Sequence, residues 1–150
     1  ITTAFPEVRL KQFLEMRGAD SGPWANICAL PAFWVGLLYD EESLAEAEAL
    51  ASHITPDDVM NARLSVAMNG LNGELAGEDV HKLATRLLEI ATAGLRRRGI
   101  CDDGGNDETG FLQPLKSIIE SRKTLAEVML DLYHQDWNQD IDQVFAANQY

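Results

Sequence analysis

The chain has 150 residues, enough for one domain with a hydrophobic core, and it carries 12 Lys and Arg against 24 Asp and Glu, a formal net charge of -12. An acidic chain repels phosphate backbones, which argues against nucleic acid as a partner. No run of about 18 or more apolar residues occurs, so no segment is expected to cross a membrane. Its two cysteines form neither a disulfide framework nor a metal-type spacing, and they favour a reducing, cytoplasmic location.

The first stretch, residues 7–17, predicts one amphipathic β-strand, because apolar and polar residues alternate along it without a break. Successive side chains of a strand point to opposite faces. One face then carries four hydrophobic residues and one polar residue, namely Val8, Leu10, Gln12, Leu14 and Met16. The other face carries carboxylates, cations and one aromatic ring, namely Glu7, Arg9, Lys11, Phe13, Glu15 and Arg17. One apolar face is typical of a strand in an antiparallel sheet whose second face meets solvent or a cleft.

The polar face of this strand has two interpretations. It is a solvated face whose opposite charges pair weakly, each pair contributing about 0–1 kcal/mol. Alternatively it is a catalytic surface, because the carboxylate of Glu15 suits Mg²⁺, which binds through one or two carboxylates together with substrate phosphates. The guanidinium of Arg17, two residues away, offers a planar fork of donors to phosphoryl oxygens. A carboxylate and a guanidinium placed side by side are what phosphoryl transfer needs, and the residues alone leave both interpretations open.

About six helices are expected after the strand, at residues 24–39, 40–53, 55–68, 78–98, 111–121 and 124–134. The first of them is apolar nearly all round and is therefore expected to be buried. Thr55 followed by Pro56 marks the start of the third helix, and Thr124 with Glu127 forms a capping box at the start of the last.

The predicted fold class is α+β and mostly α: one N-terminal amphipathic strand of a larger antiparallel sheet, followed by about six helices. Residues 1–20 are expected to form the strand and its turn, and residues 21–150 a helical layer. A lone strand is not stable, so it must pair with strands outside this chain or with a second copy, as in a homodimer. The start at Ile1 has neither a basic leader nor an initiator Met, which favours a chain that begins within a longer protein.

Two blocks of sequence, residues 8–24 and 28–40, closely resemble the plant and proteobacterial type of glutamate–cysteine ligase. The resemblance resumes at residues 93–98, 107–109, 111–112 and 132–134, and it reaches the end of the chain through Asp142, Val144, Phe145 and Tyr150. It therefore spans nearly the whole chain. The chain resembles the C-terminal part of such an enzyme, so it is expected to be a single segment of a larger catalytic domain.

This resemblance implies an ATP-dependent ligation of the γ-carboxylate of L-glutamate to L-cysteine through γ-glutamyl phosphate, the first step of glutathione biosynthesis. It also implies a larger antiparallel sheet akin to that of glutamine synthetase. Glu15 matches a Mg²⁺ ligand and Arg17 a catalytic Arg that steadies the transferred phosphoryl group. Arg9 and Lys11 share their face and are candidates for substrate binding. Trp24 is a further candidate, because it follows the strand by a short turn.

The expected partners are ATP, L-glutamate, L-cysteine and the remaining N-terminal part of the ligase, and this chain alone is expected to be inactive. Two other functions stay open. One is a related carboxylate–amine ligase with another amine acceptor, because most of the acceptor pocket would lie outside this chain. The other is a non-catalytic helical module that mediates assembly.

Overall fold

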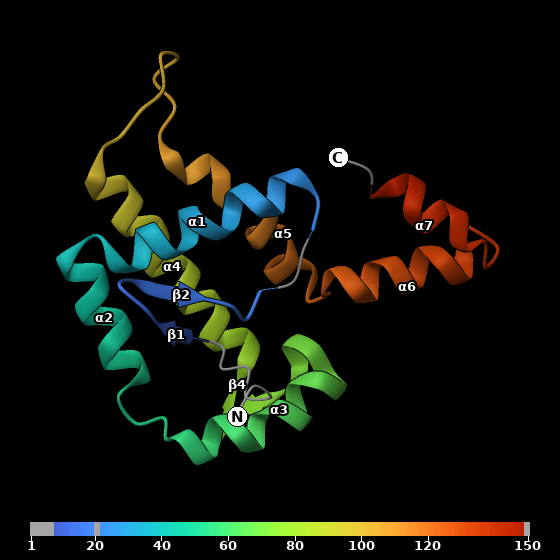
Figure 1. The fold of residues 1–150 in the computed structure, drawn as a ribbon, viewed down its shortest axis with the longest axis horizontal. Helices are drawn as coiled ribbons and strands as arrows, with labels where there is room; N and C mark the ends of the chain where they lie inside the picture. Colours follow the sequence, from blue (N-terminus) through green and yellow to red (C-terminus); the bar gives the residue numbers. More distant parts are fainter. Residues whose placement is uncertain (1–7, 20–21, 149–150) are drawn as a thin grey trace.

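The computed structural model describes residues 8–19 and 22–148, which form seven α-helices, two short 3₁₀ helices and two small hairpins (Figure 1). The fold is therefore α+β and mostly α, as the sequence predicts. The strands are β1 (Val8–Leu10), β2 (Leu14–Met16), β3 (Glu74–Leu75) and β4 (Glu78–Asp79). The helices are α1 (Trp24–Leu38), α2 (Glu41–Ala51), α3 (Pro56–Asn69), η1 (Gly70–Asn72), α4 (Val80–Arg98), η2 (Glu108–Leu112), α5 (Gln113–Ser121), α6 (Leu125–Gln135) and α7 (Ile141–Ala147).

The hydrophobic core lies where α1 crosses α4, the two helices near the centre of Figure 1. Small residues bring the two backbones into direct contact there. A Cβ atom on Gly36 would collide with the carbonyl oxygen of Ala91, and one on Gly94 would collide with that of Gly36. The buried hydrophobic cluster around this contact consists of Ala32, Leu37, Leu88, Ile90, Ala91, Leu95 and Leu112.

Hydrogen bonds of Asp40, Ser43 and Arg97 connect the start of α2 to α4. Asp40 caps α2 by accepting a hydrogen bond from the backbone N–H of Ser43 at 2.8 Å, and Arg97 donates to the same carboxylate at 2.7 Å. The hydroxyl of Ser43 is fully buried and donates to the carbonyl oxygen of Ile90 at 3.0 Å. The Arg97 hydrogen bond, helped by the Ser43 N–H, lowers the pKa of Asp40 from 3.8 to about 2. The carboxylate is therefore ionised at neutral pH, and its hydrogen bonds hold the junction between α1 and α2 against α4.

Most predicted helix starts are confirmed, but the predicted start of the longest helix, α4, is wrong. Thr124 forms the expected capping box at the start of α6, and Thr55, expected to start a helix, caps α3 and forms a capping box with Asp58. The helix predicted from residue 78 begins instead at Val80, because Glu78 and Asp79 form strand β4 opposite β3. The reversal between these strands places Ala76 at φ 53° and Gly77 at φ 78°.

The prediction of one continuous strand over residues 7–17 is wrong. The chain bends at residues 11–13 and returns as an antiparallel hairpin, with Val8 opposite Met16, Arg9 opposite Glu15 and Leu10 opposite Leu14. Residues that face each other directly in a hairpin lie on the same side of it. The hairpin therefore keeps the predicted division into an apolar and a polar face. Glu7 and Asp20 lie outside the described residues.

The expected burial of α1 is only partly correct. Ala29, Ala32, Gly36 and Leu37 face the core. Trp24, in the first turn, is 70% exposed, and Ile27 is also exposed. At the other end of the chain, α6 and α7 extend away from the α1–α4 core (Figure 1). No helix in the described part of the chain is both long and apolar enough to span a membrane.

Candidate functional site

The polar face of the β1–β2 hairpin gathers four of the five predicted site residues. Arg9 and Glu15 face each other across the two strands, and the Nε–H of Arg9 donates to Oε2 of Glu15 at 2.6 Å. Nζ of Lys11 lies 3.8 Å from Oε1 of Glu15, and Nε of Arg17 lies 3.9 Å from Oε2. These four side chains carry a net charge of +2, whereas the whole chain carries -12. The hairpin is therefore an electropositive surface on an acidic protein.

The hydrogen bond from Arg9, together with the positive charges of Arg9, Lys11 and Arg17, lowers the pKa of Glu15. Glu15 is therefore ionised at neutral pH and acts as an acceptor only. Its Oε1 lies 3.8 Å from Nζ of Lys11, beyond hydrogen-bonding distance, so among the residues that the structure describes this oxygen is open to a further donor or to a cation.

A single carboxylate does not make a metal site. In residues 8–19 and 22–148, no three His, Cys, Asp or Glu side chains come together in a way that could hold an ion. The chemistry of the cluster still suits Mg²⁺ in one respect, because Mg²⁺ is often bound by one or two carboxylates while phosphate oxygens and waters supply the rest. The guanidinium of Arg17 beside that carboxylate suits phosphate oxygens. The hairpin could thus supply one metal ligand and several phosphate contacts.

Trp24, the fifth predicted site residue, is not brought to the hairpin. It stands at the start of α1 and lines a shallow hollow with Cys28, Phe111 and Pro114, and no residue of the hairpin lines that hollow. The proposed role of Trp24 in substrate binding stays a prediction.

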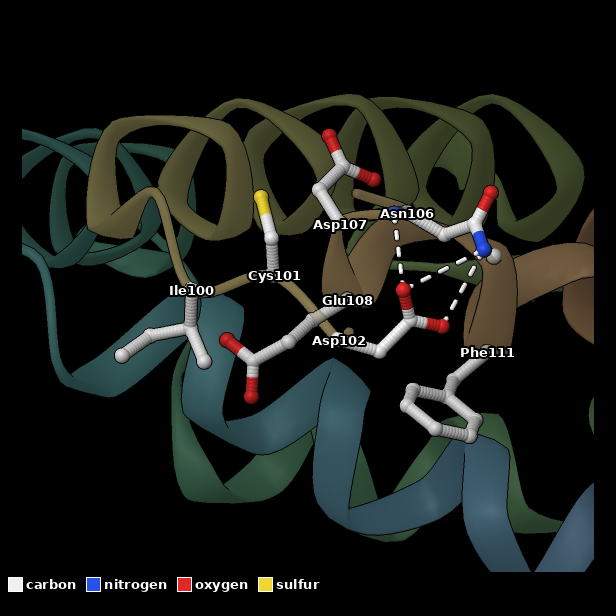
Figure 2. Close-up of a pocket in the computed structure, with 8 residues that line it drawn as sticks. Ile100, Cys101, Asp102, Asn106, Asp107, Glu108 and Phe111 are labelled. Atoms are coloured by element: carbon white, nitrogen blue, oxygen red, sulfur yellow. Dashed lines mark hydrogen bonds between the residues drawn. The ribbon is translucent and has the colours of Figure 1, made fainter. Parts of the chain in front are cut away.

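A second hollow, of about 480 Å³, lies beside the loop between α4 and η2 (Figure 2). Its lining includes three carboxylates, and each already has a partner within the chain. Asp102 accepts hydrogen bonds from the backbone and side chain of Asn106, the contacts drawn as dashed lines in Figure 2. Asp107 caps the start of η2, and Glu108 pairs with Arg98 at 3.1 Å. These carboxylates hold the loop in shape, which favours the hairpin as the functional site.

The sequence matches a family model over residues 1–147, and this model describes glutamate–cysteine ligase family 2 (GCS2). The chain belongs to this family. Three plant members are named glutamate–cysteine ligase and chloroplastic. The A form of Oryza sativa subsp. indica is 46% identical over 145 residues, which are 97% of this chain and 28% of that protein. The proteins of Medicago truncatula and Arabidopsis thaliana are 44% and 43% identical over the same share of this chain.

This GCS2-family chain spans only 27 to 28% of the length of those relatives. The expectation of a cytoplasmic location is wrong, because the names of these relatives indicate the chloroplast.

Proposed function

We propose that this chain is the C-terminal part of a glutamate–cysteine ligase and that its β1–β2 hairpin forms one side of the site that binds ATP. One observation carries the proposal: Arg9, Lys11 and Arg17 surround the ionised Glu15 on a single face of the hairpin. An electropositive surface with one carboxylate suits a magnesium–nucleotide complex, whose phosphates carry the negative charge. Family membership supports the ligase class of reaction.

In the proposed reaction, an oxygen of the γ-carboxylate of L-glutamate attacks the γ-phosphorus of ATP, and the bond to the bridging oxygen breaks to release ADP. The amine of L-cysteine then attacks the acyl carbon of γ-glutamyl phosphate. The bond from that carbon to the phosphate oxygen breaks, phosphate leaves with the electron pair, and the amine loses a proton. The product, γ-glutamylcysteine, is the first intermediate of glutathione biosynthesis.

The hairpin residues serve this reaction by position and charge. Glu15 would hold Mg²⁺ through Oε1, and the bound ion would neutralise phosphate charge. Arg17 would donate to the oxygens of the transferred phosphoryl group, where charge builds up in the transition state. Arg9 and Lys11 add positive charge on the same face, and Trp24 would line a more distant part of the substrate cleft.

The apolar face of the hairpin supports a partner beyond this chain. Leu10 is 79% exposed and Leu14 is 59% exposed, although both belong to the face that a sheet would normally bury. The remaining N-terminal part of the ligase would cover this face and extend the two strands into a larger antiparallel sheet. It would also supply the remaining residues that bind the nucleotide, and it would contain the pockets for the two amino acids. We therefore expect this chain alone to be inactive.

A second candidate function is a helical assembly module that forms a homodimer without catalysis. It is favoured by the outer face of α3, where Met60, Leu64 and Met68 recur every fourth residue and are all exposed. A chain that dimerises while the full-length protein binds no nucleotide would support this function over the ligase.

The direct test of the ligase function is Arg17→Ala in the full-length enzyme. We expect kcat for γ-glutamylcysteine formation to fall about 100-fold or more, because a donor to the transition state is lost. Circular dichroism should stay unchanged. Arg86→Gln is the control, since it removes an exposed Arg that pairs with Glu46 at 2.7 Å, far from the hairpin in sequence. Unchanged turnover in Arg17→Ala would refute the assignment. Assays with other amines in place of cysteine would separate this enzyme from a related ligase.

A further inference from the structure

Arg9 and Glu15 form a close ion pair across the hairpin. They stand directly opposite each other in the register, and Nε of Arg9 is 2.6 Å from Oε2 of Glu15. The side chain of Glu15 is 30% exposed, and that of Arg9 is 43% exposed. Oε2 of Glu15 is therefore occupied by Arg9, while Oε1 lies 3.8 Å from the nearest ammonium, that of Lys11.

The geometry points to Arg9 as a positioning residue, which holds Glu15 so that Oε1 is presented to the divalent metal of a nucleoside triphosphate complex. This inference rests on the function proposed above, and it gives Arg9 a role different from direct substrate binding. A hydrogen-bonded outer partner orients a metal-binding carboxylate and is commonly required for metal affinity.

Two physical features support this role. Glu15 has three rotatable side-chain bonds, and a guanidinium anchored on the opposite strand restricts them, so less freedom is lost when the ligand binds. The net charge of the four-residue cluster disfavours a bare divalent cation, since Arg9, Lys11 and Arg17 all repel it. The same charge attracts a metal–nucleotide complex, which is negative overall. The expected ligand is thus the complex and not the free ion.

A double-mutant cycle in the full-length enzyme tests this role. Binding of the Mn²⁺ complex of the non-hydrolysable β,γ-imido analogue of ATP is followed by the electron paramagnetic resonance signal of Mn²⁺. We expect Arg9→Gln to raise Kd about tenfold. Glu15→Gln should raise Kd by at least as much. Adding Arg9→Gln to the Glu15→Gln enzyme should raise Kd much less than it does in the wild type, because Arg9 acts mainly through Glu15 and otherwise adds only its share of the positive charge. Arg86→Gln, which removes an exposed ion pair elsewhere, should leave Kd at the wild-type value.

The inference about Arg9 is overturned if the two effects multiply in the double variant, since Arg9 would then contact the nucleotide itself. It is also overturned if Arg9→Gln leaves Kd unchanged while Glu15→Gln raises it, and in that case the proposed function stands. If neither variant changes Kd, the nucleotide site is not at the hairpin and the proposed function fails as well. Circular dichroism identifies a misfolded Arg9→Gln protein, because its spectrum would depart from that of the wild type. Arg9→Lys, which keeps the charge and lacks the guanidinium fork, then takes its place in the cycle.

Discussion

Replacing Gly36 by Ala probes the close crossing of α1 and α4. The new Cβ would collide with the carbonyl oxygen of Ala91 and lie 2.9 Å from its Cα. Both are backbone atoms of a fully buried residue, so they cannot move aside as a flexible side chain does. Overpacking of this kind costs about 3 kcal/mol, at the upper end of its usual range. The better helix propensity of Ala returns about 1 kcal/mol. We expect a net loss of about 2 kcal/mol in the free energy of unfolding.

Urea denaturation followed by circular dichroism measures this loss. The midpoint should fall while the m-value stays constant, and Tm should drop by about 4–8 °C. Gly110→Ala is the matched control, because no atom lies within 4 Å of its expected Cβ and its φ is not in the left-handed region. That variant should stay within about 0.5 kcal/mol of the wild type. A Gly36→Ala protein as stable as the wild type would show that the helices do not touch at this residue.

Three further predictions concern the carboxylate of Asp40, the capping box of α6 and the exposed face of α3. The pKa of Asp40 is about 2 when folded and about 3.8 when unfolded, so the unfolded state binds more protons between these values. The stability that Asp40 confers should be complete above about pH 4 and lost as the pH falls towards 2. In urea titrations, the difference in free energy of unfolding between the wild type and Asp40→Asn should therefore shrink over that range of pH. Thr124→Ala removes the capping box of α6 and should cost about 1 kcal/mol; an unchanged urea midpoint would contradict this. Leu64→Gln on α3 should change stability by less than about 0.5 kcal/mol, because Leu64 is 77% exposed; a larger loss would mean that this face is packed in solution.

The hairpin shows what an alternating pattern can and cannot predict. Arg9 pairs with Glu15 and Leu10 with Leu14, so odd positions face odd positions and even positions face even ones. A continuous strand and this hairpin therefore give the same two faces, and the pattern cannot distinguish them. In a continuous strand Arg9 and Glu15 would stand about 20 Å apart. The 2.6 Å contact between them could not be predicted for that reason, although their common face could.

Helix caps were easier to predict from the sequence than the short β3–β4 hairpin or the exposed side of α1. The caps at Thr55 and Thr124 predicted helix starts correctly, because a side-chain oxygen followed three residues later by Asp or Glu satisfies the free backbone N–H groups locally. The β3–β4 hairpin was missed, because its turn uses Ala76 before Gly77 where Asn or Asp is usual. The exposure of Ile27 on α1 was missed, since hydrophobicity alone does not tell which side of a helix meets its neighbours.

The most direct test of the nucleotide site is a calorimetric titration of Mg²⁺–ATP into the full-length enzyme and, in parallel, into this 150-residue chain. We predict binding by the full-length enzyme and none by the chain, because Glu15 and Arg17 supply only one side of the site. Binding by the isolated chain would mean that these residues already hold a complete nucleotide site. Absence of binding by the full-length enzyme would contradict the ligase function itself.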